Sequence, residues 1–318
     1  MNLDHPVLSS LLPVVFLIFI GLVADKAKLV RGESVRDLSN LVFLVLTQAL
    51  LFRTMSSVHI EQLDFRPVVQ YFLVAGTLFV SMLWVYGGNS RASVLALASI
   101  FSNTLMIGVP LVGLAYGQEG LVLLFTLISL HALVLLSAAT LVLELQVARE
   151  QAALSGQPRP IWRTVASAIR NAIIHPVPLP ILVGLLYAQT DWGLHPIVDR
   201  PLALLGSAFG PIALVLVGIT LSQTPIGQQF KSALKLSLVK TVLHPLLMLA
   251  LGWLLGLRGL HLAVMTVAAA LPIGANVFLF SQRYRKEEET VTAGVAVSTA
   301  MAVLSVSAVM AVLPLLPA

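Results

Sequence analysis

Two long apolar runs, each broken near its middle, constrain this chain more than any other feature. The first, Ala92 to Tyr116, contains the stretch Ser102-Asn103-Thr104-Leu105-Met106-Ile107-Gly108-Val109-Pro110. The second, His261 to Tyr284, contains Leu271-Pro272-Ile273-Gly274-Ala275-Asn276. A helix in lipid must satisfy its backbone hydrogen bonds internally, and proline removes a donor. We therefore expect both helices to break at mid-depth, and paired breaks of this kind indicate the binding site of a transporter.

The composition is that of an integral membrane protein. Of the 318 residues, 58% are hydrophobic and 10% are charged, whereas soluble domains carry roughly 25% charged residues. The apolar runs are continuous over about twenty residues, which predicts an all-α protein and not a barrel of alternating strands. Because the chain has no cysteine, disulfides and cysteine metal sites are excluded, and we expect no metal or cofactor.

The hydrophobic runs predict ten transmembrane helices. They are Val7 to Ala24, Leu38 to Met55, Val68 to Tyr86, Ala92 to Tyr116, Gly120 to Leu145, His175 to Ala188, Pro201 to Ser222, Leu234 to Leu257, His261 to Tyr284 and Val291 to Leu316. No basic leader or cleavage site precedes the first run, so we read it as a span and not as a removed signal.

Basic residues set the expected orientation. Loops after odd-numbered runs hold 14 lysines and arginines, and loops after even-numbered runs hold 4. By the positive-inside rule, the odd loops are cytoplasmic and both termini lie outside a cytoplasmic (inner) membrane. The net charge of +5 therefore indicates membrane topology and not a nucleic-acid partner.

The ten runs divide into two sets of five. A basic linker over residues 148–170 separates a first repeat, 1–147, from a second repeat of opposite orientation, 171–318. This pattern predicts an inverted repeat, in which the two broken helices meet near the midplane. The second half of each broken helix would then present its partly positive N-terminal end to the meeting point.

The sequence resembles a known family, the auxin efflux carriers, whose bacterial members include proteins described as malonate or malate permeases. The resemblance rests on Leu38 to Phe43 with Ala49 to Phe52, Ser102 to Leu111, Pro201 to Leu205, Gly218 to Leu221, the Lys240 to Pro245 spacing, and Pro272 to Tyr284. The short linker is similar to that of the bacterial members.

The resemblance implies a fold akin to sodium/proton antiporters and bile-acid symporters, with two crossed broken helices. Spans 1, 2, 6 and 7 would form a scaffold and homodimer interface, and spans 3–5 and 8–10 a mobile transport domain. Two departures concern the scaffold. Gln48 stands where the family commonly has proline, and His175-Pro176 stands near its usual Asn-Pro.

The candidate substrate-binding residues gather at the two breaks: Asn103, Thr104, Gly108 and Pro110 in the first, and Pro272, Gly274 and Asn276 in the second. An asparagine amide both donates and accepts, so Asn103 and Asn276 can hold a substrate oxygen or cap freed backbone groups. The prolines and glycines can form true breaks or only kink packed helices.

Three further candidates are polar residues inside spans. Lys240 is the one lysine or arginine that lies within a span away from its ends, so it either serves an anion or extends to the cytoplasmic interface. His131 and His244 can act as ligands or proton carriers, or simply as hydrogen-bonded packing residues.

The leading hypothesis is a secondary transporter of a small organic anion, such as an auxin-like carboxylate, malate or malonate, working by alternating access. H⁺ or Na⁺ is the candidate coupling ion. The alternatives are a sodium or proton antiporter of the same fold, although no carboxylate lies in the spans around the breaks, and a transporter-like receptor. An intramembrane enzyme is disfavoured because the chain lacks a nucleophile elbow, a zinc pair and a phosphate loop.

Overall fold

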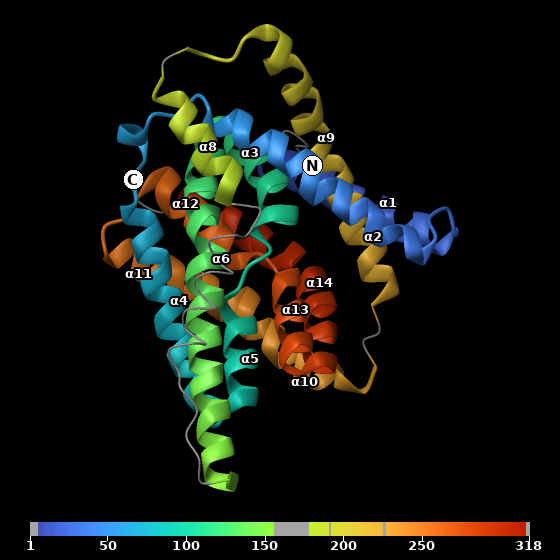
Figure 1. The fold of residues 1–318 in the computed structure, drawn as a ribbon, viewed down its shortest axis with the longest axis vertical. Helices are drawn as coiled ribbons and strands as arrows, with labels where there is room; N and C mark the ends of the chain where they lie inside the picture. Colours follow the sequence, from blue (N-terminus) through green and yellow to red (C-terminus); the bar gives the residue numbers. More distant parts are fainter. Residues whose placement is uncertain (1–5, 156–177, 191, 225–226, 316–318) are drawn as a thin grey trace.

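The computed structural model describes residues 6–155, 178–190, 192–224 and 227–315, and every regular element in these ranges is helical (Figure 1). The α-helices are α1 (Pro6–Lys26), α2 (Gly32–Leu41), α3 (Thr47–Met55), α4 (Arg66–Val85), α5 (Ser90–Ile100), α6 (Val109–Ser155), α8 (Pro178–Ala188), α9 (Pro196–Gln223), α10 (Phe230–Leu238), α11 (His244–Leu254), α12 (Gly259–Ala270), α13 (Ala275–Tyr284) and α14 (Glu288–Val312). Three π-helical turns, η1 (Val42–Leu46), η3 (Thr104–Gly108) and η5 (Val239–Leu243), lie between or before these helices.

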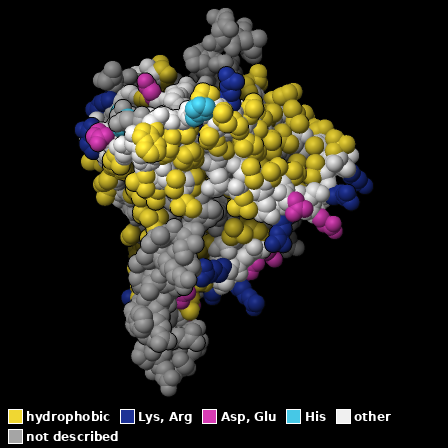
Figure 2. All heavy atoms as spheres, turned by 45° about the horizontal axis from the view of Figure 1, so that its top comes forward, with side chains coloured by type: hydrophobic (Ala, Val, Ile, Leu, Met, Phe, Trp, Pro, Cys, Tyr) yellow, Lys and Arg dark blue, Asp and Glu magenta, His cyan; other side chains and the backbone are white. Residues whose placement is uncertain are grey.

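The described part of the chain contains six helical segments that are long and apolar enough to cross a membrane. They are Gly32–Met55, Arg66–Val85, Thr104–Val147, Pro196–Gln223, Phe230–Leu254 and Glu288–Leu315. Shorter apolar helices cover Ser90–Ile100, Leu179–Ala188 and Gly259–Ala270. Figure 2 shows a broad apolar surface with charged side chains near its edges. The protein is therefore a helical multi-pass membrane protein, while the ten-span count stays a prediction.

One group of helices packs through close backbone contact. Helix α1 lies along α9, and α3 lies along α8 (Figure 1). A Cβ atom built on Gly21 would lie 2.0 Å from the carbonyl oxygen of Val215, and one built on Gly184 would lie 2.7 Å from that of Phe52. Glycine is required at both positions, as is common where membrane helices approach closely.

The fourth apolar run is broken, as predicted. Helix α5 begins where the side chain of Asn89 accepts from the N–H of Ala92, and it ends at Ile100 because Phe101 has extended dihedral angles (φ −79°, ψ 110°). The chain becomes helical again at η3 and continues into α6. Gly117, with φ +61° and ψ −152°, then interrupts α6 close to the expected boundary between the fourth and fifth runs.

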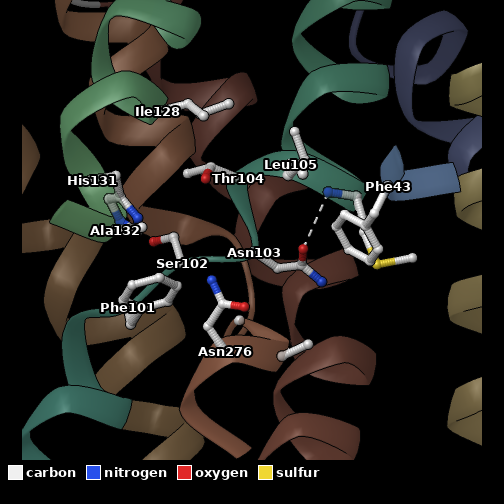
Figure 3. A pocket seen from close by; sticks show the side chains of 13 residues that line it. Phe43, Phe101, Ser102, Asn103, Thr104, Leu105, Ile128, His131, Ala132 and Asn276 are labelled. Carbon is white, nitrogen blue, oxygen red and sulfur yellow. Dashed lines mark hydrogen bonds between the residues drawn. The ribbon is translucent and has the colours of Figure 1, made fainter. Parts of the chain in front are cut away.

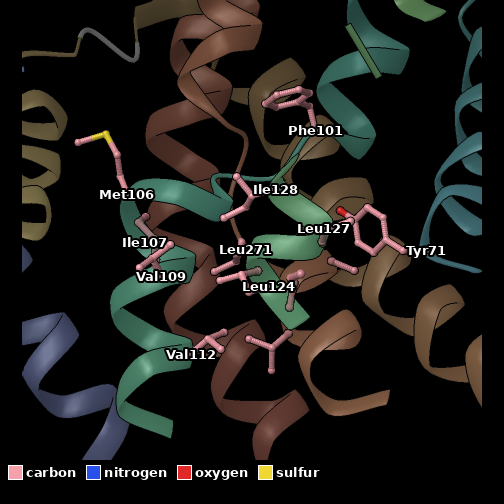
Figure 4. Packing of buried hydrophobic residues seen from close by; sticks show 14 of the residues in the cluster. Tyr71, Phe101, Met106, Ile107, Val109, Val112, Leu124, Leu127, Ile128 and Leu271 are labelled. Carbon is pink, nitrogen blue, oxygen red and sulfur yellow. The ribbon is translucent and has the colours of Figure 1, made fainter. Parts of the chain in front are cut away.

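The ninth run is broken by its proline. Leu271 has φ −59° and ψ 152°, the extended conformation that a following proline favours, so α12 ends there and α13 begins at Ala275. The residues between the two helices are buried in the apolar core. Figure 4 shows the side chain of Leu271 among those of Leu124, Leu127 and Ile128 from α6.

The predicted linker begins as helix, because α6 continues to Ser155. The rest of that linker, residues 156–170, lies outside the described residues, as do the His175-Pro176 pair and both chain ends. The two-repeat division at residues 1–147 and 171–318 accordingly stays a prediction.

Candidate functional site

The two interrupted stretches lie against each other and pair through their backbones. Ser102 and Ile273 form an isolated antiparallel β-bridge. Beside it, the N–H of Asn103 donates to the carbonyl oxygen of Pro272 over 2.9 Å. The bridge satisfies backbone groups that the broken helices would otherwise leave unpaired in an apolar environment.

The other side of the bridge requires a glycine. The N–H of Gly274 donates to the carbonyl oxygen of Phe101 over 3.0 Å. A Cβ atom built on Gly274 would lie 2.8 Å from a ring carbon of Phe101 and 3.0 Å from the carbonyl oxygen of Ser102. A side chain at this position would therefore push the two stretches apart.

Polar side chains complete the hydrogen bonding of the breaks. The amide oxygen of Asn103 accepts from the N–H of Met106 over 3.3 Å, which caps η3. In the second break, the N–H of Ile273 donates to the buried hydroxyl of Ser298 on α14 over 3.1 Å. The amide oxygen of Asn103 thus caps a freed backbone group, and its amide nitrogen remains able to donate to a ligand.

Lys240 closes the C-terminal end of α12. Its side chain is fully buried, and its ammonium donates to the carbonyl oxygens of Ala269 over 2.6 Å and of Leu271 over 2.7 Å. The last carbonyls of a helix have no intrahelical partner and form the negative end of its dipole. Lys240 therefore does not reach the cytoplasmic interface, and its charge is directed at a helix end.

A cavity of about 70 Å³ lies beside the bridge. Its described lining consists of Phe43, Phe101, Ser102, Asn103, Thr104, Leu105, Met106, Ile128, His131, Ala132, Gly274, Ala275 and Asn276. Figure 3 shows the amide of Asn276 pointing towards the stretch that carries Ser102 and Asn103. One water needs ~10–15 Å³ by this measure, so the cavity holds several waters or one small polar group.

The cavity brings together half of the predicted binding residues. Asn103, Thr104, His131, Gly274 and Asn276 line it. The other five are not among its described lining residues. Gly108 packs against Leu271, and Pro110 lies near Gly210. The carbonyl of Pro272 accepts from Asn103, Lys240 caps α12, and His244 packs on Tyr71.

A buried polar cluster adjoins the cavity on the side of α4. The hydroxyl of Tyr71 lies 3.1 Å from the hydroxyl oxygen of Ser102 and 3.4 Å from Nε2 of His131. The ring of His131 packs on that of Phe101, with centroids 4.5 Å apart. His244 packs on Tyr71 at 5.6 Å, and neither of its ring nitrogens has a hydrogen-bond partner among the described residues.

Sequence reasoning did not single out several residues of this site, among them Tyr71 and Phe43. Tyr71 lies in an ordinary apolar run, and no motif marks it. Phe43 lies in η1, where the side-chain amide of Gln48 donates to the Phe43 carbonyl over 2.9 Å. The π-helical turn η1 marks Phe43 in the structure as a candidate site residue, because such turns often occur at functional sites.

A second cavity lies elsewhere in the described part of the chain. It is larger, at about 550 Å³, and lies at the ends of α3 and α8 and the start of α9, away from the breaks, where Arg53 pairs with Asp199. No group of three or more His, Cys, Asp or Glu suited to a metal ion occurs among the described residues.

Comparisons with known proteins identify the family of the chain. A family model described as "Membrane transport protein" matches residues 6–310. The chain is 26% identical over 306 residues to "Putative malonate transporter" of Rhizobium meliloti (strain 1021), covering 93% of this chain and 92% of that protein.

Two further relatives are named as carriers or transporters. "Auxin efflux carrier component 8" of Arabidopsis thaliana is 25% identical over 272 residues, covering 72% of this chain and 74% of the relative. "Uncharacterized transporter YfdV" of Escherichia coli (strain K12) is 22% identical over 304 residues, covering 92% of each chain. The family match spans nearly the whole chain, and the protein is a member of the membrane transport protein family to which auxin efflux carriers belong.

Proposed function

We propose that the chain is a secondary transporter that moves a small organic anion by alternating access, with the anion held between the two breaks. This proposal rests on the chemistry of the residues that line the cavity. Asn103 and Asn276 supply amide groups, and the start of α13 at Gly274 and Ala275 supplies a helix N-terminal end. No Asp or Glu is among its described lining residues. Amide donors and helix N-termini favour negative charge.

The size of the cavity points to a small acid. A space of about 70 Å³ suits a carboxylate or dicarboxylate fragment better than a large ring system. One relative that aligns over 93% of this chain carries the name malonate transporter, which supports the same substrate class. Malonate is therefore the first substrate to test.

We further propose ten spans arranged as two inverted repeats of five. The glycine contacts support this arrangement. Gly21 of α1 lies on the carbonyl of Val215, and Gly184 of α8 lies on the carbonyl of Phe52. In both cases the first span of one repeat meets the second span of the other, as a twofold-related pair of repeats requires. The antiparallel bridge between the breaks supports crossed helices at the same point.

In this arrangement α1, α2, α3, α8 and α9 form the scaffold and the homodimer contact, and the remaining helices form the moving unit. The backbone bridge ties both breaks into one body. Access to the cavity would thus alternate by movement of that body against the scaffold. The proposed location is a cytoplasmic membrane, with both termini outside.

The experiment compares malonate with its neutral diamide. Purified protein in nanodiscs should show a thermal shift with malonate and not with malonamide, because a ligand stabilises the state it binds. Protein in liposomes should accumulate labelled malonate. Asn276→Ala should weaken both signals, while Asn40→Ala, an exposed asparagine on α2, should leave them unchanged.

Three outcomes would contradict the proposal. Preference for malonamide would exclude an anion site. Binding of malonate without flux into liposomes would indicate a receptor. Cation exchange in the absence of any organic solute would indicate an antiporter.

A further inference from the structure

His131 is the one titratable side chain among the described residues that line the cavity. It is 2% exposed, and its ring is held between Phe101 and the hydroxyl of Tyr71. Both neighbours fix the orientation of the ring. The imidazole thus forms part of the cavity wall in this orientation.

The charged groups around His131 do not provide an unengaged cation that could pair with a bound anion. The titratable and charged groups that face it in the described structure are Tyr71 from α4, and Lys240 and His244 from the helix formed by η5 and α11. The ammonium of Lys240 is engaged by two carbonyl oxygens of α12 and does not line the cavity. The amides and the helix N-terminal end offer the anion only partial positive charges, so a full positive charge in the cavity wall would strengthen its binding.

His244 does not meet this need, although it is also buried. It is absent from the described cavity lining, and the ring of Tyr71 packs against it with centroids 5.6 Å apart. Lys240 repels a positive charge on either histidine, so the two differ in that His131 lines the cavity among the described residues. The two histidines are thus chemically alike and differently placed.

We infer that His131 takes up one proton together with each anion, which makes this family member a proton-coupled carrier of organic anions. The inference rests on the proposed function and adds its coupling ion. A carboxylate within about 4–6 Å favours the protonated imidazole, and by linkage the protonated imidazole favours the carboxylate to the same degree. The anion and the proton then cross together.

Tyr71 and Ser102 are positioning residues for this step. When both ring nitrogens of His131 carry protons, Nε2 donates to the hydroxyl of Tyr71, which donates in turn to Ser102. The chain of hydroxyls can thus accept the proton of Nε2 in the charged ring without an acidic residue.

The test measures anion binding as a function of pH. The probes are malonate and methanedisulfonate, because the sulfonate groups keep their charge at every pH used. In nanodiscs, the affinity for methanedisulfonate should rise by up to about tenfold per pH unit as the pH falls from 8 to 6, the limit for one linked proton. Malonate binding in weak buffer should take up one proton per site.

Two matched variants locate the proton. His131→Gln should remove both the pH dependence and the proton uptake, whereas His244→Gln should retain both. Tyr71→Phe, which keeps the ring and removes the hydroxyl, should shift the pH midpoint of binding. A merely structural role for Tyr71 would lower thermal stability and leave the midpoint in place.

The outcomes separate this inference from the proposed function. Anion binding that does not vary with pH and takes up no proton overturns proton coupling and leaves the transporter standing. Loss of the pH dependence in His244→Gln, but not in His131→Gln, overturns the assignment. Absence of binding by either probe at any pH overturns the proposed function and the inference together.

Discussion

The ammonium nitrogen of Lys240 lies 2.7 Å from the carbonyl oxygen of Leu271, the residue at which the ninth apolar run stops being helical. A lysine from one helix thus caps the end of another inside the apolar core. This ammonium is not among the groups that line the cavity in the described structure, so we expect its charge to stabilise the break more than a ligand in the cavity.

Lys240→Met tests that distinction. The methionine keeps the buried volume but leaves two carbonyls unpaired, and each unpaired buried group costs about 1–3 kcal/mol, partly offset by removal of the buried charge. We expect a lower Tm in nanodiscs and an unchanged thermal shift on adding malonate. An unchanged Tm with loss of the malonate shift would show that the lysine binds the anion.

Gly274→Ala should separate the two breaks. The added methyl would lie 2.8 Å from the Phe101 ring, and overpacking of this kind typically costs 1–3 kcal/mol. We expect reduced thermal stability and little malonate uptake by liposomes. Gly76→Ala on α4 is the control, because a Cβ there meets nothing within 4 Å and should preserve or raise the Tm. Equal behaviour of the two variants would contradict the close approach.

The two asparagines should differ in a measurable way. Asn103 caps η3, and loss of a cap typically costs about 1 kcal/mol, so Asn103→Ala should lower both the Tm and the malonate shift. Asn276 lines the cavity and points towards the first break, so Asn276→Ala should lower the malonate shift with little change in the Tm. A larger loss of stability in Asn276→Ala would reverse these roles.

Much of this fold could be predicted from the chain. The proline at position 272 and the polar stretch after Ser102 marked both breaks, because a lipid-embedded helix has few ways to tolerate such residues. Backbone pairing across the chain could not be predicted, since it depends on how distant segments pack. Because that packing is not visible in the sequence, Lys240 and His131 are equal candidates for the binding site by sequence, although of the two only His131 lines the described cavity.

The orientation can be tested because the chain has no cysteine of its own. Glu61 and Glu288 are exposed residues in loops predicted to lie on opposite sides of the membrane. In intact cells, a membrane-impermeant thiol reagent should label Glu61→Cys and should not label Glu288→Cys until the cells are opened. The reverse pattern would place both termini in the cytoplasm.

A pH dependence of stability is expected at the start of α5. The carboxylate of Glu150 accepts from the N–H of Ser90 over 2.8 Å and from its hydroxyl over 2.9 Å. The hydrogen bond from that backbone N–H holds the pKa of Glu150 below its usual range. This contribution is therefore complete above the unfolded pKa of about 4.3 and is lost as the pH falls through the folded pKa.

Glu150→Gln should accordingly lower the Tm at pH 7, and the difference from the unchanged protein should shrink near pH 4. Arg149→Gln, which alters the neighbouring exposed charge, should not reproduce that pattern. A Tm difference that stays constant from pH 7 to 4 would argue against the carboxylate as the cause.

The hydrogen bond from Asn103 to Pro272 also has a consequence for biosynthesis. The first break enters the bilayer while its acceptor has not yet been synthesised, and an unpaired backbone N–H in lipid costs several kcal/mol. We therefore expect the fourth apolar run to stay hydrated or incompletely inserted until the ninth apolar run has been synthesised. Truncation before the second break should leave a chain that membrane quality control degrades, however apolar its helices are.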